Sequence, residues 1–347
     1  MKKIITLIIS VLLILCMLTA CGGTDSRDAG TDSSDNTGSA DGKLRAVTTI
    51  FPIYDWMRII AGEDNEAADI SMLIDTGVDL HSFQPTAEDI KKISECDVFV
   101  YVGGESDEWV EDALKETAKK DIVVVNLMEV MGDKALEEEL KEGMQEEHEE
   151  DEREGDKHEG DKHAGDEETE YDEHIWLSLK NASVLTNAIA EALAEADPDN
   201  ADTYRSNAQA YIGRLDSLDK EYKKAAESGN TRTLLFGDRF PFRYLTDDYG
   251  LDYYAAFVGC SAETEASFET IAFLSAKADE LGLRCIMTIE GTDHSIANSI
   301  VNNTKTKDQQ ILTLDSMQGT TAQDVEAGAT YLSVMENNLE VLKEALK

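Results

Sequence analysis

Histidine and carboxylate side chains gather in one short stretch of this sequence, "HEGDKHAGDEETEYDEHIW", which begins at His158 and ends at Trp176. The stretch holds three of the six histidines of the chain, His158, His163 and His174. Imidazole and carboxylate are the ligands that divalent cations of borderline or hard character prefer, so the composition indicates metal binding. Composition does not establish geometry, and a solvated run of charges would read the same way.

The segment around these histidines is strongly acidic. Residues 137–173 hold 20 acidic against four basic residues and almost no apolar ones, which predicts a solvated loop. We expect His148, His158 and His163 to capture metal only weakly, because no packed shell would orient them. His174 adjoins the apolar run "IWLSL", so we expect it to be ordered.

A second ordered histidine stands in "LIDTGVDLHSFQPTAEDI". His81 follows a predicted strand and precedes a helix that Pro85 and a capping box from Thr86 to Asp89 would start. Loops at the carboxyl ends of strands are where open α/β sheets bind ligands. A lone histidine there would most often be a surface residue, but the presence of His174 favours a shared metal site.

Eight short β-rich runs, separated by helical stretches, must position these histidines. Near-continuous apolar strands that alternate with helices indicate buried parallel sheets. We therefore predict an α/β protein with two lobes, each built on a roughly four-stranded, mainly parallel sheet. The predicted strands are residues 44–50, 67–74, 98–103, 122–127, 233–237, 252–257, 284–289 and 310–314.

A long helix is predicted between the lobes, at residues 198–227. Apolar residues recur there at alternating steps of four and three: Tyr204, Ala208, Tyr211, Leu215, Leu218 and Tyr222. A coiled coil would show the same stripe, but the flanking lobes favour a rigid strut between domains. The expected organisation is an N-terminal metal-binding lobe at 43–180, a helical region at 181–230 and a C-terminal lobe at 231–347.

The first 42 residues have the pattern of an export signal and a tether. Lys2 and Lys3 precede an apolar run at residues 4–15, and "LTAC" ends at Cys21. The apolar run is short for a membrane span, which disfavours an uncleaved anchor. "LTAC" resembles the lipobox of bacterial lipoproteins, which implies a signal peptide at 1–20 and a lipid on Cys21. Residues 22–42 are polar and are predicted to be a disordered tether, so the protein would work outside the cytoplasmic membrane.

The net charge of −41, from 31 basic and 72 acidic residues, argues against binding to nucleic acid or to anionic lipid surfaces. Membrane attachment is expected through the lipid alone. Beyond the signal and the lipid site, three cysteines remain in an oxidising compartment. We expect a disulfide between Cys260 and Cys285, which flank predicted strands of the second lobe, and a buried thiol at Cys96.

Two motifs, "GVDLHSFQPTAEDI" and "DEHIWLSLKNA", resemble the histidine motifs of the lipoproteins that supply zinc or manganese to ABC importers. The resemblance extends from about Lys43 to the end of the chain. It implies that His81 and His174 bind the metal, that the permease of an importer is the partner, and that the protein is a monomer. The acidic loop with histidines is similar to that of zinc-specific members.

The third ligand of that family, a histidine or glutamate, begins a motif that "LLFGDRFPFRYL" matches only in part. Arg239 stands at the ligand position, and a guanidinium cannot bind a cation. Asp238, one residue earlier, is therefore predicted to take the role. The alternative for Asp238 is a salt bridge to Arg239 or Arg243.

The fourth ligand of the family is a carboxylate after the third strand of the second lobe. Glu290, in "IEGTDHSIA", matches this position best, and Asp293 and His294 are weaker candidates. Two imidazoles and two carboxylates suit Zn²⁺, although Mn²⁺ could occupy an expanded site. A metal-buffering or adhesive lipoprotein stays an alternative. A metallohydrolase is disfavoured because neither an HExxH run nor a Gly-x-Ser-x-Gly elbow is present.

Overall fold

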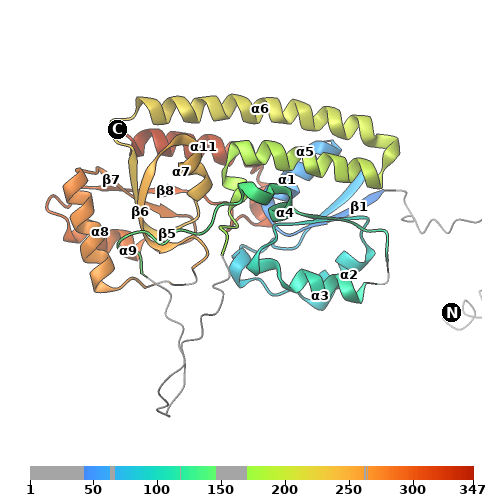
Figure 1. Ribbon diagram of the computed structural model, residues 1–347, viewed down its shortest axis with the longest axis horizontal. Coiled ribbons are helices and arrows are strands. Elements are labelled where there is room, and N and C mark those ends of the chain that lie inside the picture. The colour runs from blue at the N-terminus through green and yellow to red at the C-terminus, as the bar shows by residue number, and fades with distance from the viewer. Residues whose placement is uncertain (1–42, 63–66, 118, 146–169, 262, 264) are drawn as a thin grey trace, which may run out of the picture. The chain divides into compact units, whose positions relative to one another are not determined.

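The computed structural model describes residues 43–62, 67–117, 119–145, 170–261, 263 and 265–347 (Figure 1). Several predictions fall outside these residues: the signal peptide, the lipid site at Cys21, the tether, and the loop histidines His148, His158 and His163.

The described part of the chain contains two separate four-stranded sheets, and all strand pairs in both sheets are parallel. Their orders are β2-β1-β3-β4 and β6-β5-β7-β8, so each sheet has its first strand in an inner position. The predicted α/β class and all eight predicted strands are confirmed, with ends that differ by a few residues. The strands are β1 (Leu44–Thr48), β2 (Ala68–Met72), β3 (Val98–Tyr101), β4 (Val123–Asn126), β5 (Thr233–Phe240), β6 (Asp252–Val258), β7 (Cys285–Ile289) and β8 (Gln310–Leu314).

Helices connect the strands. The capping box predicted for α2 is present, since the side chains of Thr86 and Asp89 each accept a hydrogen bond from the other residue's backbone N–H. The α-helices are α1 (Phe51–Ala61), α2 (Ala87–Glu95), α3 (Trp109–Glu116), α4 (Leu127–Met131), α5 (Leu179–Ala196), α6 (Ala201–Ser228), α7 (Arg243–Tyr249), α8 (Phe268–Leu281), α9 (Ser295–Asn303), α10 (Ala322–Glu326) and α11 (Tyr331–Ala345). The 3₁₀ turns are η1 (Leu80–Ser82), η2 (Glu105–Asp107), η3 (Gly132–Lys134), η4 (Ile175–Leu177) and η5 (Pro198–Asn200).

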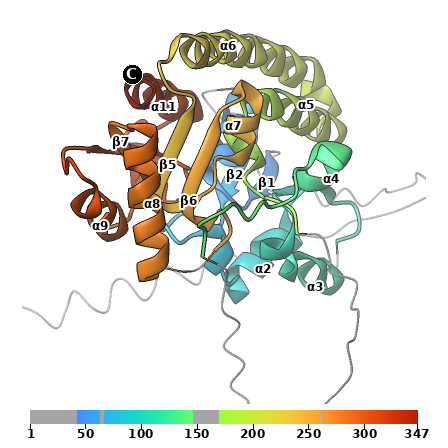
Figure 2. The same ribbon diagram turned by 60° about the vertical axis from the view of Figure 1, so that its left-hand side comes forward.

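The long helix α6 runs across both sheets, as Figures 1 and 2 show. It packs on α1 and α5 on the side of the first sheet and on α7 and α11 on the side of the second. The predicted apolar stripe is its buried face: Tyr204, Ala208, Tyr211, Leu215, Leu218 and Tyr222. The helix begins three residues later than predicted because residues 198–200 form η5. No helix in the part of the chain that the structure describes is long and apolar enough to cross a membrane.

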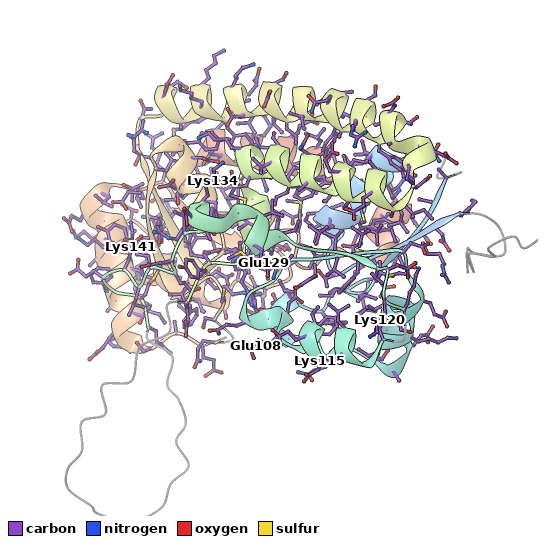
Figure 3. The ribbon with its side chains drawn as sticks, turned by 45° about the vertical axis from the view of Figure 1, so that its right-hand side comes forward. Glu108, Lys115, Lys120, Glu129, Lys134 and Lys141 are labelled. Carbon is purple, nitrogen blue, oxygen red and sulfur yellow. The ribbon has the colours of Figure 1, made fainter. Side chains whose placement is uncertain are left out.

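The first residues of the acidic segment pack against the second lobe. Lys141, labelled in Figure 3, forms an ion pair with Asp252 and lies 4.0 Å from the centre of the Tyr253 ring. Met144 is buried, and the backbone N–H of Gln145 donates to the carbonyl of Ala256 at 2.9 Å. Residues 137–145 therefore differ from the solvated loop that composition predicts, because apolar contacts and ion pairs to β6 hold them.

The predicted disulfide between Cys260 and Cys285 is wrong. Both residues are free thiols, as is Cys96, which is buried as expected. Cys285 begins β7, whereas Cys260 follows the last residue of β6. In a sheet whose strands all run parallel, these positions lie at opposite edges, and β5 separates the two strands.

Candidate metal centre

His81 lies in η1, in the connection that follows β2. The Asp79 carboxylate accepts a hydrogen bond from the backbone N–H of His81 at 3.0 Å and so shapes this turn. Nδ1 of His81 lies 2.7 Å from the hydroxyl oxygen of Ser106 and 3.6 Å from Oε2 of Glu173. Because Nδ1 has these partners, Nε2 is the nitrogen that is free to bind a ligand.

His174 is fully buried and precedes η4. Oδ1 of Asp172 accepts from the backbone N–H of His174 at 2.8 Å and lies 3.0 Å from Nδ1 of the same residue. The carboxylate thus places the Nδ1 proton and sets the plane of the ring, an arrangement found behind metal-binding histidines. For His174, as for His81, Nε2 is the nitrogen left for a ligand.

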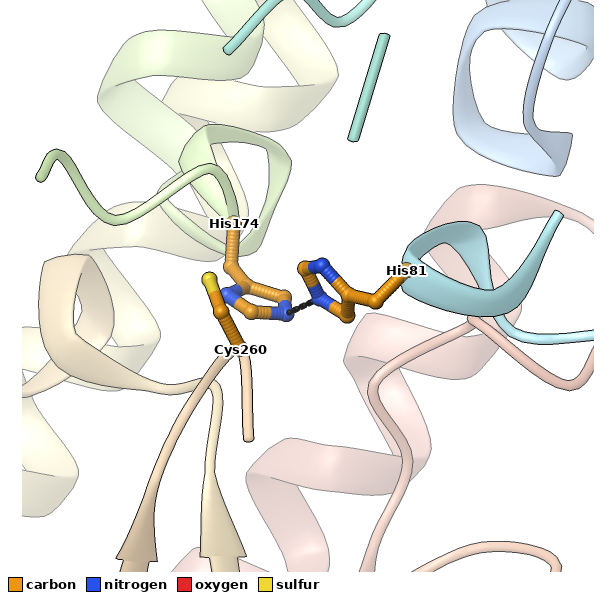
Figure 4. Close-up of side chains that lie close together, drawn as sticks. All are labelled: His81, His174 and Cys260. Carbon is orange, nitrogen blue, oxygen red and sulfur yellow. Dashed lines mark hydrogen bonds between the residues drawn. The ribbon is translucent and has the colours of Figure 1, made fainter. Parts of the chain in front are cut away.

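The two free nitrogens face each other. Nε2 of His81 and Nε2 of His174 lie 3.3 Å apart, joined by the dashed line in Figure 4. Two imidazoles that bind one tetrahedral zinc ion at 2.0–2.1 Å would have their nitrogens about 3.3 to 3.4 Å apart. The observed separation therefore fits a shared zinc ion without rearrangement of either ring.

The two histidines have opposite pKa shifts. Burial and the neighbouring His174 lower the pKa of His81 to about 3, so His81 is neutral near pH 7. Burial alone would lower the pKa of His174, but the carboxylates of Asp172 and Glu173 raise it above the ordinary value. A proton on Nε2 of His174 can therefore bridge to Nε2 of His81, and a divalent cation would take the place of that proton.

A third ligand atom belongs to this group. Sγ of Cys260 and one ring nitrogen each of His81 and His174 all lie within 4.8 Å of one another (Figure 4). This is the one group of three or more metal-ligating side chains among the residues that the structure describes. The predictions assigned Cys260 to a disulfide and did not place it in the site.

Asp238 is not in this group. The alignment of β5 with β6 shifts between Phe236 and Arg239, so Asp238 lies in a bulge, which redirects its side chain. Its Oδ2 accepts hydrogen bonds from the hydroxyls of Thr288 at 2.6 Å and Thr292 at 3.0 Å. The alternative prediction for Asp238, a salt bridge to Arg239 or Arg243, is not among the ion pairs of the described residues. The assignment of Asp238 as a metal ligand stays a prediction.

Glu290 also lies outside the group. Its carboxylate accepts from the backbone N–H of Ser316 at 2.7 Å, the Ser316 hydroxyl at 2.6 Å and the backbone N–H of Gln318 at 3.1 Å. These bonds hold the loop that follows β8. The loop brings the side-chain amide of Gln318 to the histidines: in the orientation that satisfies both of its ends, its oxygen lies 3.3 Å from Nε2 of His174 and its nitrogen donates to Asp79.

The two weaker candidates, Asp293 and His294, line a neighbouring cavity of ≈ 490 Å³. His294 is the residue before α9 and has a φ of 59°, in the left-handed region. Its Nδ1 lies 3.1 Å from the hydroxyl of Thr288, which ties it to the same hydrogen-bond cluster as Asp238. The cavity also has Asp79, Arg239 and Ser261 in its wall, so it adjoins the histidine pair.

Arg239 occupies the position where the motif would place a ligand, and it joins the two halves of the site. Its guanidinium forms an ion pair with Asp79, two residues before His81. A second guanidinium nitrogen donates to the carbonyl of Ser261, next to Cys260, at 3.3 Å. Arg239 therefore holds the connection that carries His81 and the connection that carries Cys260 in fixed relation.

The family model described as zinc-uptake complex component A, periplasmic (ZnuA) matches residues 46–345, which includes every residue of the site. The chain belongs to this family. Relatives with known sequences agree. The chain is 30% identical over 330 residues to the high-affinity zinc uptake system protein ZnuA of Bacillus subtilis, covering 95% of this chain and 94% of that protein.

Longer relatives match over part of their length. The chain is 31% identical over 308 residues to the zinc-binding protein AdcA of Streptococcus pyogenes, covering 88% of this chain but 56% of AdcA. Among solved structures, the Zn(II)-bound ZnuA-like domain of Streptococcus pneumoniae AdcA superposes with a TM-score of 0.67 at 29% identity. That match covers 88% of this chain and 99% of the domain.

Sequence reasoning missed Cys260 although a signal for it was present. Cys260 lies two residues after the apolar strand "DYYAAFV", and ligands of open α/β sheets bind beyond the carboxyl ends of strands. The same rule supported His81 after β2. An expected pairing of cysteines in an oxidising compartment took precedence, and the strand order that makes this pairing impossible is not visible in the sequence.

Proposed function

We propose that this protein captures Zn²⁺ outside the cytoplasmic membrane and delivers it to the permease of an ABC importer. The observation that carries the proposal is the pair of Nε2 atoms of His81 and His174, 3.3 Å apart, with both Nδ1 atoms held by other groups. The two nitrogens already have the separation that a shared tetrahedral zinc ion requires, so metal binding needs little reorganisation of the side chains. Membership of the zinc-uptake family supports zinc as the cargo.

Capture and delivery require that the protein binds the ion without using it to catalyse a reaction. The family to which the chain belongs is described as a component of a zinc-uptake complex, which supports binding and delivery of the ion over hydrolysis. In our proposal the protein is a monomer, held at the outer face of the membrane by a lipid on Cys21. One relative, AdcA of Streptococcus pneumoniae, is named a zinc-binding lipoprotein.

The test is uptake of radiolabelled zinc in a strain that lacks this protein. Restoring the wild-type gene should restore uptake, and His174→Ala should not, because it removes one of the two paired nitrogens. His294→Ala is the matched control, since that histidine lies outside the group formed by His81, His174 and Cys260. Full uptake with His174→Ala would contradict the proposal. Restored manganese uptake without zinc uptake would favour the alternative cargo.

A further inference from the structure

We propose that Cys260 is the third protein ligand of the metal, so that the site has two imidazole nitrogens and one thiolate sulfur. The proposal rests on the proposed function, because it names a further ligand of the same site. It assigns to Cys260 the role that the sequence motif gave to Asp238. A site with a sulfur ligand selects thiophilic cations such as Zn²⁺ over Mn²⁺, which prefers oxygen ligands.

The distances allow this ligand set. In a tetrahedral zinc site with Zn–N of 2.0–2.1 Å and Zn–S of about 2.3 Å, a nitrogen and a sulfur lie about 3.6 Å apart. Sγ of Cys260 is already within 4.8 Å of a ring nitrogen of each histidine. The Sγ–N separations therefore exceed the tetrahedral value by about 1 Å at most, which is within the reach of one rotation of the Cys260 side chain.

The backbone around Cys260 is built to hold it beside His174. Gly259 packs so closely on the histidine ring that a Cβ there would lie 3.1 Å from Cε1 of His174 and 2.9 Å from the carbonyl of Phe240. The backbone N–H of Cys260 donates to Oε1 of Glu138 at 3.0 Å. Arg239 holds the next residue, Ser261, through its carbonyl. Three contacts on consecutive residues thus define the position of the thiol.

The competing ligand atoms are engaged elsewhere. The carboxylate of Asp238 is satisfied by the hydroxyls of Thr288 and Thr292, and Arg239 has no lone pair to donate. The other two described cysteines, Cys96 and Cys285, lie outside the group. Glu173 also lies near the pair, but its Oε2 is 3.6 Å from Nδ1 of His81, whereas Nε2 is the nitrogen that faces His174.

Binding through Cys260 has defined proton chemistry. The thiol loses its proton to solvent as the Zn–S bond forms, because a thiol bound to the metal is deprotonated outright.

Since Cys260 follows β6 and the histidines come from the first half of the chain, the metal would join the two halves of the described fold. Loss of the metal would then loosen the same boundary that Arg239 bridges.

Cobalt is the probe that tests the proposal, because Co²⁺ replaces Zn²⁺ and a bond from sulfur gives a charge-transfer absorption in the near ultraviolet. The full chain, purified in detergent, is titrated with Co²⁺ and then with Zn²⁺. We expect this absorption to grow to one equivalent in the wild type and to disappear when zinc displaces cobalt. Cys260→Ser should abolish it and raise the zinc Kd about a hundredfold. Cys285→Ser, the matched control for a free thiol in the same sheet, should change neither.

Three results would overturn the proposal, and the second of them would also overturn the proposed function. If wild-type protein binds one equivalent of Co²⁺ without the sulfur absorption, Cys260 is not a ligand, while the proposed function stands. If the wild-type protein binds neither metal, the proposed function fails and the ligand assignment fails with it. Alkylation of Cys260 at the same rate with and without bound zinc would also exclude the Zn–S bond.

Discussion

Asp172 contacts both the backbone and the side chain of His174. Its Oδ1 accepts a hydrogen bond from the backbone N–H of His174 at 2.8 Å and lies 3.0 Å from the ring Nδ1. The imidazole is fully buried, so no water can replace these bonds. This one carboxylate therefore determines both the direction of the ring and the identity of the nitrogen that faces His81.

Asp172→Asn should weaken zinc binding by about 10- to 100-fold, because a neutral amide oxygen accepts the bonds from the backbone N–H and Nδ1 of His174 more weakly than the charged carboxylate does. Competition against a chromophoric zinc chelator measures the change. Asp248→Asn is the control, since that carboxylate binds Ser178 and Lys180 instead of a histidine. Zinc affinity that stays at the wild-type level in a folded Asp172→Asn protein would show that the carboxylate does not position the ligand.

Arg239 and Asp79 should be energetically coupled, since their ion pair is about one fifth exposed and spans the site. In a double-mutant cycle with Arg239→Met and Asp79→Asn, urea unfolding should give a coupling free energy of about 0.5 to 3 kcal/mol. The exposed pair of Arg205 and Glu191 should couple by less than about 1 kcal/mol. A coupling near zero for Arg239 and Asp79 would mean that the pair contributes nothing to joining the two halves.

The buried carboxylate of Asp55 predicts a specific dependence of stability on pH. Burial raises the pKa of Asp55 to about 6, although the backbone N–H of Tyr331 donates to it. The folded state then binds a proton that the unfolded state has lost, so this residue makes stability fall as pH rises from about 4 to 6. The change amounts to about 3 kcal/mol at 1.36 kcal/mol per unit.

Asp55→Asn should remove this fall, so its stability relative to wild type should improve by about 3 kcal/mol between pH 4 and pH 7. Urea unfolding at both pH values measures the difference. Asp324→Asn should show the opposite trend, because Thr321 lowers the pKa of Asp324 in its capping box. A constant difference between Asp55→Asn and wild type at all pH values would refute the assignment.

The loop histidines should add only weak binding. Replacing His148, His158 and His163 with alanine should leave one tight zinc site and remove weaker binding that calorimetry detects in the wild type. Substitution is a cleaner test than deletion, because Met144 and Gln145 at the start of this segment pack on the second lobe. Loss of the tight site in the triple variant would move the main site into the loop.

The sequence predicted the fold better than it predicted the site. Strands and the long helix follow from local apolar periodicity, which is why all eight strands and the buried stripe of α6 were found. His81 and His174 were predicted as ligands because each adjoins an ordered element of the chain, and the structure places their Nε2 atoms 3.3 Å apart. The bulge at Asp238 was not, since it depends on how β5 aligns with β6, and Gly237 there packs so tightly that a Cβ would lie 2.6 Å from the Cα of Ala297.

The surroundings of Cys260 could not be predicted from the sequence either. Its distance from Cys285 depends on strand order and direction, which no local pattern encodes. Its closeness to His174 depends on Gly259 and on a contact between residues 86 positions apart in the chain.

A crystal structure of the zinc-loaded protein, with anomalous data at the zinc edge, tests the central claim most directly. We predict one strong peak between His81 and His174, about 2.0 to 2.1 Å from each Nε2. A tight zinc peak located elsewhere, with the two Nε2 atoms still in contact and no metal between them, would contradict it.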